Sequence, residues 1–335
     1  QELPVTDRAA QTVIDGRHDI ENILTKRDDR LLVIAGPCSI HDMDAALEYA
    51  HKMKALREEV KEKINLVMRV YFEKPRTTVG WKGYINDPHL DGSFAMNQGL
   101  EMARKLLLDI LDRGLPVATE FLDLLSPQFI SDLVTWGAIG ARTTESQIHR
   151  ELASGLSMPV GFKNRTDGDL QVAVDAILSA RHPHCFPSLT HEGAPAVLTT
   201  SGNEHTHLVL RGGKRGTNYH AEAVQEAAAA LAKDGLPPRL MVDCSHGNSN
   251  KDYRRQGEVA AAVADQLRSG SRHVMGVMIE SHLVAGNQKI PADLSQLTYG
   301  QSITDACIDL GSTREVLAEL AGAVAQVKSK AAALI

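Results

Sequence analysis

Short apolar runs recur along the chain, and each leads to a residue whose side chain can bind an anion, a proton or a metal ion. The runs are 31–35 before Cys38, 66–68 before Arg69, 117–119 before Glu120, 138–141 before Arg142, 160–162 before Lys163, 208–210 before Arg211, 241–242 before His246 and 274–279 before Glu280. Continuous apolar runs are typical of parallel strands that are buried on both faces. Eight such strands predict an α/β fold, a (β/α)8 TIM barrel, whose active site forms at the carboxyl ends of the strands.

Segments with a helical period separate these strands, as in Leu100, Ala103, Leu107 and Ile110. The same reasoning predicts further helices over 45–60, 147–153, 169–180, 221–232, 257–267 and 314–333. Ser312 and Glu315 have the spacing of a capping box at the start of the last helix. The alternation of strand and helix supports the barrel.

Two stretches fall outside the alternation. Residues 184–201 contain two β-prone pieces, 185–189 and 196–200, joined by a turn-rich segment, and they predict a hairpin inserted before the sixth strand. Residues 1–29 precede the first strand and predict an N-terminal arm with a helix over 11–25. We therefore expect this arm to be followed by one catalytic barrel over 30–335.

Composition limits the class of protein. The chain has 335 residues, of which 43% are hydrophobic and 23% charged, as expected for one large globular domain. Its net charge of −6 argues against a nucleic-acid partner, and no apolar stretch reaches the length of a membrane span. The four cysteines show no disulfide spacing, so we expect a reduced, cytoplasmic protein.

The basic residues at the predicted strand ends form one group: Arg69, Lys74, Arg76, Arg142, Lys163 and Arg211. Six cations at one rim suit a ligand with several anionic groups, whereas the alternative for each cation is a salt bridge to a loop carboxylate. Pro75 stiffens the loop between Lys74 and Arg76, and Thr77 and Thr78 add hydroxyl donors for a second phosphate. No phosphate-loop or GxGxxG motif accompanies them, so no nucleotide cofactor is expected.

A second group of side chains has the chemistry of metal ligands: Cys38, His246, Glu280 and Asp305. The first three follow strands one, seven and eight, which are neighbours in a closed barrel, so one divalent ion is expected, and this mixed ligand set tolerates Mn²⁺, Fe²⁺, Co²⁺ or Zn²⁺. The competing interpretation is a buried apolar cysteine and a hydrogen-bonded core histidine. Lys163 could also form a Schiff base, but its place among other cations argues against that role. We expect His41 to be structural, because the Cys38/His41 pair lacks the second half of a zinc finger.

Six segments resemble type I 3-deoxy-D-arabino-heptulosonate-7-phosphate (DAHP) synthases over nearly the whole chain. They are 36–42 (GPCSIHD), 69–83 with KPRT at 74–77, 137–146 (GAIGARTTES), 211–213 (RGG), 243–246 (DCSH) and 302–307 (SITDAC). The resemblance implies condensation of phosphoenolpyruvate with erythrose 4-phosphate and water to give DAHP and phosphate, the first step of the shikimate pathway to aromatic amino acids.

The resemblance also implies roles for the residues. Phosphoenolpyruvate would be held by Arg69, Lys74, Arg142, Lys163 and Arg211, and erythrose 4-phosphate by Lys74, Pro75, Arg76, Thr77 and Asp305. Lys74, Glu120, His246 and Cys38 would be catalytic. The metal bound by Cys38, His246, Glu280 and Asp305 would polarise the aldehyde, and Glu120 would place the water that adds to C2.

Regulation and assembly are implied in the same way. The family carries a feedback inhibitor, an aromatic amino acid, near the inserted hairpin, so Pro127, Ser157, Phe186 and Ser188 are candidate pocket residues. Its N-terminal arm supports assembly, and a dimer or tetramer is expected. One departure stands out: the family motif has glycine where this chain has Arg165, which predicts an extra cation near the phosphate site.

Two other functions compete. The related 3-deoxy-octulosonate 8-phosphate synthases use the same chemistry on arabinose 5-phosphate, but carry a Lys-Ala-Asn-Arg type of loop where this chain has Lys74-Pro-Arg-Thr77. A sensor that binds the ligands without turnover would also need the anion site. All the predicted ligand residues are present, which favours the enzyme.

Overall fold

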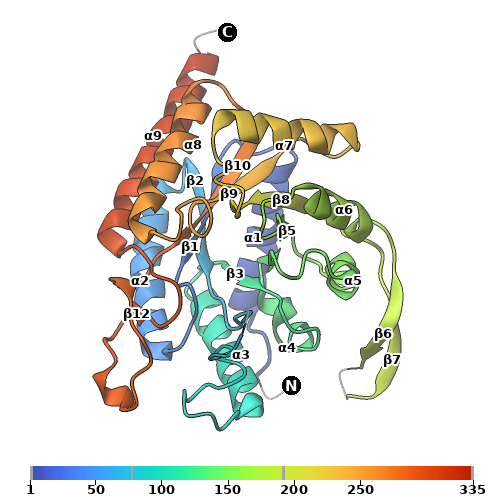
Figure 1. The fold of residues 1–335 in the computed structure, drawn as a ribbon, viewed down its shortest axis with the longest axis vertical. Coiled ribbons are helices and arrows are strands. Elements are labelled where there is room, and N and C mark those ends of the chain that lie inside the picture. The colour runs from blue at the N-terminus through green and yellow to red at the C-terminus, as the bar shows by residue number, and fades with distance from the viewer. Residues whose placement is uncertain (1–2, 77, 191–192, 333–335) are drawn as a thin grey trace.

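Eight parallel strands close into a barrel in the computed structural model, which describes residues 3–76, 78–190 and 193–332. The strands are β1 (Leu31–Gly36), β2 (Ile64–Arg69), β3 (Val117–Glu120), β4 (Trp136–Ile139), β5 (Val160–Lys163), β8 (Thr206–Leu210), β9 (Leu240–Asp243) and β10 (Val274–Glu280). They pair in chain order, and β10 closes the ring against β1. The predicted (β/α)8 barrel is confirmed (Figure 1).

Helices connect these strands and cover the barrel from outside (Figure 1). They are α2 (Met43–Val60), α3 (Met96–Leu111), α4 (Pro127–Ile130), α5 (Gln147–Gly155), α6 (Gln171–Ala180), α7 (Ala221–Lys233), α8 (Gln256–Arg268) and α9 (Leu310–Ala332). The capping box predicted at Ser312 and Glu315 is wrong. The helix starts earlier, because Asp309 accepts a hydrogen bond from the Ser312 N–H at 2.8 Å and caps the first turn.

The N-terminal segment closes the base of the barrel. Helix α1 (Asp7–Leu24) begins four residues earlier than predicted, because Thr6 caps it by accepting a hydrogen bond from the Ala9 N–H. Ile20 and Ile23 are fully buried and pack with side chains of the barrel interior. The buried face of α1 therefore belongs to the core, and a role of the arm in assembly stays a prediction.

Alternate residues of each strand point into the barrel. Leu32 and Ile34 of β1 pack with the interior cluster, whereas Leu31 and Val33 pack in the cluster between strands and helices. Close to the base, the Trp136 indole N–H donates to His207 Nε2 across 3.3 Å. Burial lowers the pKa of His207 to about 3, which keeps its ring neutral among apolar neighbours.

Two small sheets lie outside the barrel. β6 (Cys185–Leu189) and β7 (Pro195–Thr199) pair antiparallel between α6 and β8, and this hairpin lies at the periphery in Figure 1. β11 (Val284–Asn287) and β12 (Gln301–Ser302) order the loop after β10. Among the described residues, no helix has the length and hydropathy needed to cross a bilayer.

We expect Ile23→Ala to lower the free energy of unfolding by about 2–5 kcal/mol, because it leaves a cavity under the barrel. Ile14→Ala on the same helix is the matched control, because Ile14 is 60% exposed, and it should change stability by less than about 0.5 kcal/mol. Urea unfolding followed by circular dichroism measures both. Equal effects of the two substitutions would show that α1 does not stabilise the barrel through its buried face.

Candidate active site

Five of the eight barrel strands end on a charged residue: Arg69, Glu120, Lys163, Asp243 and Glu280. All five are buried, with exposed fractions of 8% or less. Parallel strands bring their carboxyl ends to one mouth, so these side chains share the same end of the barrel. Buried charges are tolerated in proteins when they are paired, and pairing decides the geometry of this mouth.

Arg69 joins β2 to β10, the two strands that flank β1, and to the loop after β1. Its Nη2 donates to Glu280 Oε1 at 2.9 Å and to the Cys38 carbonyl at 3.2 Å, and its Nε donates to the Pro37 carbonyl at 3.1 Å. The guanidinium lies over the Tyr71 ring, 3.5 Å from its centroid. Most donors of Arg69 are thus engaged within the protein.

A candidate metal centre lies beside this ion pair. One ligand atom each from Cys38, Glu280 and Asp305 lies within 4.8 Å of the others. The first two side chains are buried and Asp305 is exposed, so the cluster opens toward solvent. One thiol and two carboxylates suit a divalent transition metal, and the donor set therefore fits the predicted ion.

His246 lies at the edge of this cluster. Its Nε2 is 3.8 Å from Glu280 Oε1, and its Nδ1 is 3.0 Å from Asp243 Oδ2. The residue has a φ of 54°, a left-handed conformation that a histidine adopts at a cost in free energy. The structure thus brings three of the four predicted ligands into one group and holds the fourth next to it.

The protonation states of the cluster are set by burial and by charge. Burial raises the pKa of the Cys38 thiol, Glu280 raises it further, and the nearby Lys74 ammonium opposes both. Lys74 Nζ lies 3.1 Å from Cys38 Sγ and 3.2 Å from the Cys38 carbonyl. Burial also raises the pKa of Glu280, but His246, Arg69 and Lys74 together hold it below its ordinary value.

The opposite side of the mouth carries cations. Lys163 Nζ lies 3.3 Å from Asp243 Oδ2 and 3.9 Å from Glu120 Oε2. The pKa of Arg211 is lowered, mainly by burial. The Asp243 carboxylate opposes this shift, and the neighbouring Arg142 adds to it. Within the described residues, neither Arg142 nor Arg211 forms an ion pair. Two neighbouring arginines without a protein counter-ion make a site for an anion.

The contacts of Lys163 and the surroundings of His41 bear on their alternative roles. The charged partners of Lys163 differ from the apolar pocket that activates a Schiff-base lysine, so the contacts do not favour that role. His41 does not belong to the metal group found among the described residues. Burial lowers the pKa of His41, which is in keeping with a structural residue.

The loop after β2 continues the cationic side. Lys74 and Lys82 pair through their backbones, and the exposed Arg76 donates from Nε to the Trp81 carbonyl at 2.7 Å. Pro75 lies between the two cations, and Thr77 lies outside the described residues. The loop therefore presents Lys74 inward and Arg76 at the surface.

Arg165 does not act as a free cation near this site. Its guanidinium pairs with Asp167, with Nε 3.1 Å from Oδ1, and Nη1 lies 3.6 Å from Glu145. The left-handed position of the turn belongs to Gly168, with a φ of 106°, and not to residue 165. The expected extra charge is thus neutralised, and the turn does not require a glycine at 165.

A separate cavity of about 590 Å³ lies between α4, α5 and the β6–β7 hairpin. Pro127, Phe186 and Ser188 line it, as the sequence predicted for an effector pocket. Ser157 is outside its lining and accepts a hydrogen bond from Arg17 Nη1 of α1 at 2.8 Å. Most of the wall is apolar, and the volume is in the range of small-molecule sites.

Comparison with known proteins bears on this geometry. A model of the DAHP synthetase I family matches residues 4–318. The chain belongs to the DAHP synthetase I family.

Several relatives of known activity are similar over almost their whole length. The Phe-sensitive phospho-2-dehydro-3-deoxyheptonate aldolase of Escherichia coli K12 is 58% identical over 97% of this chain and 92% of its own. The Tyr-sensitive enzyme of the same strain is 55% identical, over 95% and 89%. The Trp-sensitive enzyme of Enterobacter agglomerans is 56% identical, over 96% and 92%.

A solved structure agrees with the fold of this DAHP synthetase I family member. The phospho-2-dehydro-3-deoxyheptonate aldolase of Francisella tularensis SCHU S4 superimposes with a TM-score of 0.95 and is 52% identical, covering 98% of this chain and 95% of that one. At this similarity the two proteins share the same fold.

Three residues of the mouth were not predicted as site residues from the sequence. Asp243, buried between Lys163 and His246, comes directly after the apolar pair 241–242, so its place at a strand end was a usable signal. Gly140 was also missed: a Cβ there would lie 2.4 Å from Glu120 Oε1, so glycine gives the carboxylate its space. Tyr71, under Arg69, carries no such signal in the sequence.

We expect Asp243→Asn to weaken Mn²⁺ binding about 10- to 100-fold, because the carboxylate that orients the His246 ring is lost while the shape is kept. Calorimetric titration of the metal-free protein measures the dissociation constant. Asp252→Asn, at a carboxylate paired with the exposed Arg254, is the control and should bind Mn²⁺ normally. An unchanged constant in Asp243→Asn would exclude the orienting role.

Proposed function

We propose that this protein is a DAHP synthase, which condenses phosphoenolpyruvate with erythrose 4-phosphate and water to give DAHP and phosphate. The observation that carries the proposal is the division of one barrel mouth. Arg142 and Arg211, without an ion pair in the described part of the chain, lie on one side, and a thiol, an imidazole and two carboxylates lie on the other. Two anionic substrates, one with an aldehyde, need both kinds of group at one site.

The cations provide the binding energy for phosphoenolpyruvate. Arg142 and Arg211 lack ion pairs within the described residues and would hold the phosphate together with Lys163, which pairs with Asp243. Arg69 and Lys74 lie toward the metal side and would face the carboxylate. Fixed positive charge next to the leaving phosphate also stabilises the charge that develops on it.

Cys38, His246, Glu280 and Asp305 would hold a divalent metal, for which Mn²⁺ is our first choice. Bound there, the ion would supply Lewis acidity toward the aldehyde oxygen. Lys74 Nζ, 3.1 Å from Cys38 Sγ, would favour the thiolate form that a metal ligand needs. Asp305 is exposed and would meet the incoming sugar phosphate, whose phosphate group would bind the loop of Lys74, Pro75, Arg76 and Thr77.

The remaining step needs an oriented water molecule. The electrons of the C2=C3 double bond of phosphoenolpyruvate form a new bond to the aldehyde carbon, and the aldehyde C=O double bond opens. Water adds its oxygen at C2 and gives one proton to the former aldehyde oxygen. The C2–O bond to phosphate then breaks, the C2 hydroxyl becomes the ketone, and its proton leaves with the phosphate. Glu120 lies at the same mouth, 3.9 Å from Lys163, and would hold this water.

The 3-deoxy-octulosonate 8-phosphate synthases remain the alternative to test. The family match, the KPRT loop at 74–77 and the names of the relatives favour the four-carbon aldose.

We expect phosphate release from phosphoenolpyruvate with erythrose 4-phosphate, at least about 100-fold faster than with arabinose 5-phosphate. Activity should disappear with a chelator and return with Mn²⁺.

Cys38→Ala should lower kcat by about 100-fold or more, because a metal ligand is lost. Cys185→Ala on the exposed hairpin strand β6 is the matched control and should keep full activity. Activity that survives in chelator-treated Cys38→Ala would remove the metal from the mechanism, and preference for the pentose would overturn the assignment.

We further propose that the cavity beside the β6–β7 hairpin binds an aromatic amino acid that inhibits the enzyme. The relatives named above are sensitive to phenylalanine, tyrosine or tryptophan, at nearly equal identity to this chain. The apolar wall around Phe186 suits an aromatic ring.

A direct contact links this cavity to the mouth. Ser126, next to the lining residue Pro127, donates from Oγ to Glu73 Oε2 at 3.0 Å, and Glu73 precedes Lys74 in the chain. The net pKa of Glu73 is raised to about 7. Burial is the main cause; the Ser126 hydrogen bond opposes it, and the Asp123 carboxylate adds to it. A movement of α4 on effector binding would therefore reach Lys74 through one hydrogen bond.

We expect Ser126→Ala to raise the amino-acid concentration for half-maximal inhibition at least about fivefold, with uninhibited kcat unchanged, because the link to Glu73 is lost. Calorimetry should still detect binding of the same amino acid. Phe186→Ala is the comparison and should lose binding itself. Phenylalanine, tyrosine and tryptophan are each assayed. Inhibition of Ser126→Ala at the same amino-acid concentration as the unmodified protein would exclude this link. Insensitivity of the unmodified protein to all three amino acids would exclude the pocket.

A further inference from the structure

Three asparagines surround the loop that carries Arg211, on the cationic side of the mouth. Asn164 directly follows β5, Asn218 lies beyond the turn after β8, and Asn248 lies in the loop after β9. Asn164 and Asn248 are fully buried, and Asn218 is half-buried. A buried amide is tolerated when it is hydrogen-bonded, so the partners of these side chains show what they hold in place.

The whole amide of Asn164 is engaged at this loop. Its Oδ1 accepts from the Arg211 N–H at 2.8 Å and from Asn218 Nδ2 at 3.1 Å. Its Nδ2 donates to the Gly212 carbonyl at 3.0 Å and to the Arg165 carbonyl at 2.9 Å. Both donor hydrogens and two acceptor positions of the amide are therefore used. The side chain continues the pairing of β5 with β8 past the ends of both strands.

The other two asparagines hold the same loop from the side of β9. Asn218 Oδ1 accepts from the Gly212 N–H at 2.7 Å, and the Asn218 N–H donates to Asn248 Oδ1 at 2.8 Å. Asn248 Nδ2 donates to the Leu210 carbonyl at 3.1 Å and to the Asp243 carbonyl at 3.0 Å. The three amides thus form one connected network that joins the ends of β5, β8 and β9.

The two loops after β8 and β9 also touch through their backbones. Gly212 has a φ of 67°, and a Cβ there would lie 2.5 Å from the Gly247 carbonyl carbon and 2.6 Å from the Asn248 nitrogen. A Cβ on Gly247 would lie 2.6 Å from the Gly212 carbonyl carbon. Only glycine allows the loops to approach this closely, and the close approach brings the asparagine amides within reach of the backbone next to Arg211.

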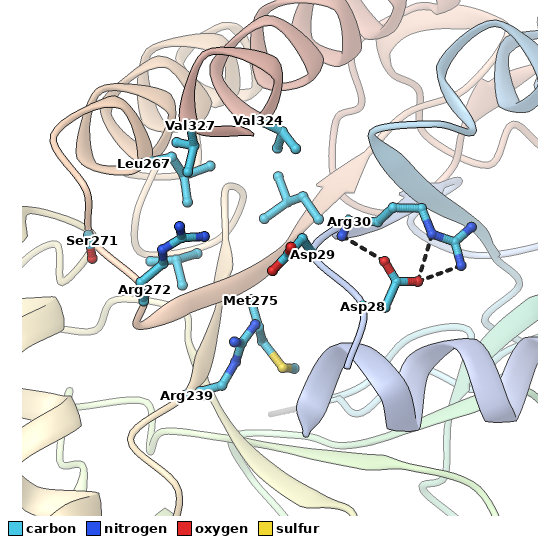
Figure 2. A pocket seen from close by; sticks show the side chains of 12 residues that line it. Asp28, Asp29, Arg30, Arg239, Leu267, Ser271, Arg272, Met275, Val324 and Val327 are labelled. Carbon is cyan, nitrogen blue, oxygen red and sulfur yellow. Dashed lines mark hydrogen bonds and ion pairs between the residues drawn. The ribbon is translucent and has the colours of Figure 1, made fainter. Parts of the chain in front are cut away.

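Arg30, at the base of the barrel, shows the other way to orient an arginine. Its guanidinium pairs with Asp28, with Nε 2.7 Å and Nη2 2.6 Å from Oδ2 (Figure 2). A carboxylate partner fixes the side chain but neutralises its charge. Arg211 is held through its backbone instead, and its Nη1 donates at 3.3 Å to the neutral Gly212 carbonyl. Its positive charge therefore stays available to a ligand.

We propose that Asn164, Asn218 and Asn248 are positioning residues for Arg211, and that they orient it toward the phosphate of phosphoenolpyruvate without neutralising its charge. The inference rests on the proposed function, in which Arg211 binds this phosphate. Amides suit the task because they hold the backbone from both sides and add no negative charge beside an anion site. An arginine that is oriented beforehand loses less conformational entropy on binding, so the network raises the affinity for phosphoenolpyruvate.

The test is isothermal titration of the full chain with phosphoenolpyruvate, in the presence of Mn²⁺ and without a sugar phosphate. Asn164→Ala should bind phosphoenolpyruvate at least about tenfold more weakly, because the loop of Arg211 is released. Asn218→Ala, at the half-buried member of the network, should bind at least about threefold more weakly and keeps the test valid if Asn164→Ala does not fold.

The matched control is Asn203→Ala. Asn203 is also buried and donates from Nδ2 to the carbonyls of Leu156 at 3.0 Å and Met158 at 2.9 Å, but it lies before β8, at the opposite end of the strand. This variant should lose stability in urea unfolding and bind phosphoenolpyruvate normally. An equal loss of affinity in Asn203→Ala would show that the loss of any buried amide has this effect, and would overturn the proposal.

A double-mutant cycle tests whether the network acts through Arg211. In an Arg211→Ala background, Asn164→Ala should change the dissociation constant by less than about twofold, because the group that it orients is absent. A full tenfold loss in that background would overturn the proposal, as would unchanged affinity in a folded Asn164→Ala or in Asn218→Ala. No binding of phosphoenolpyruvate to the unmodified protein would contradict the proposed function and the inference with it, whereas the other outcomes reject the inference alone.

Discussion

The structure of the mouth depends on one constraint, the cost of burying charge. Arg69, Lys163, Asp243 and Glu280 are almost completely removed from solvent at the ends of their strands. Each buried ion costs several kcal/mol of desolvation in the absence of a partner, so their positions are set by pairing. Arg69 joins Glu280 to the carbonyls of Pro37 and Cys38, and it thereby fixes the loop that carries the candidate metal ligand.

The same pairing connects the two halves of the candidate active site. Asp243 lies between Lys163, on the anion side, and His246, on the metal side. The charges of His246 and Lys163 outweigh burial and hold the pKa of Asp243 well below its ordinary value. The proposed anion site and the candidate metal centre thus share a carboxylate, so a change in one is expected to affect the other.

The periphery of the barrel is built differently from its mouth. At the base, α1 contributes Ile20 and Ile23 to an apolar interior, which is a stabilising function. Beside the hairpin, an apolar cavity lies next to Ser126, whose hydrogen bond to Glu73 leads to the loop of Lys74. The base of the barrel therefore contributes to stability, whereas the side of the hairpin has the chemistry of a ligand site.

The sequence by itself determined the barrel, because parallel strands buried on both faces are apolar along their length and end at one rim. It also determined the types of charged residue there: Arg69, Glu120, Lys163 and Glu280 each follow an apolar run. Only the tertiary structure decided which charges pair. Asp243 meets Lys163 and His246, and Arg165 is neutralised by Asp167 and Glu145, through contacts that no spacing encodes. The start of the last helix at Asp309 and the packing of α1 under the barrel were likewise decided in space, because a cap and a buried face depend on what lies next to them.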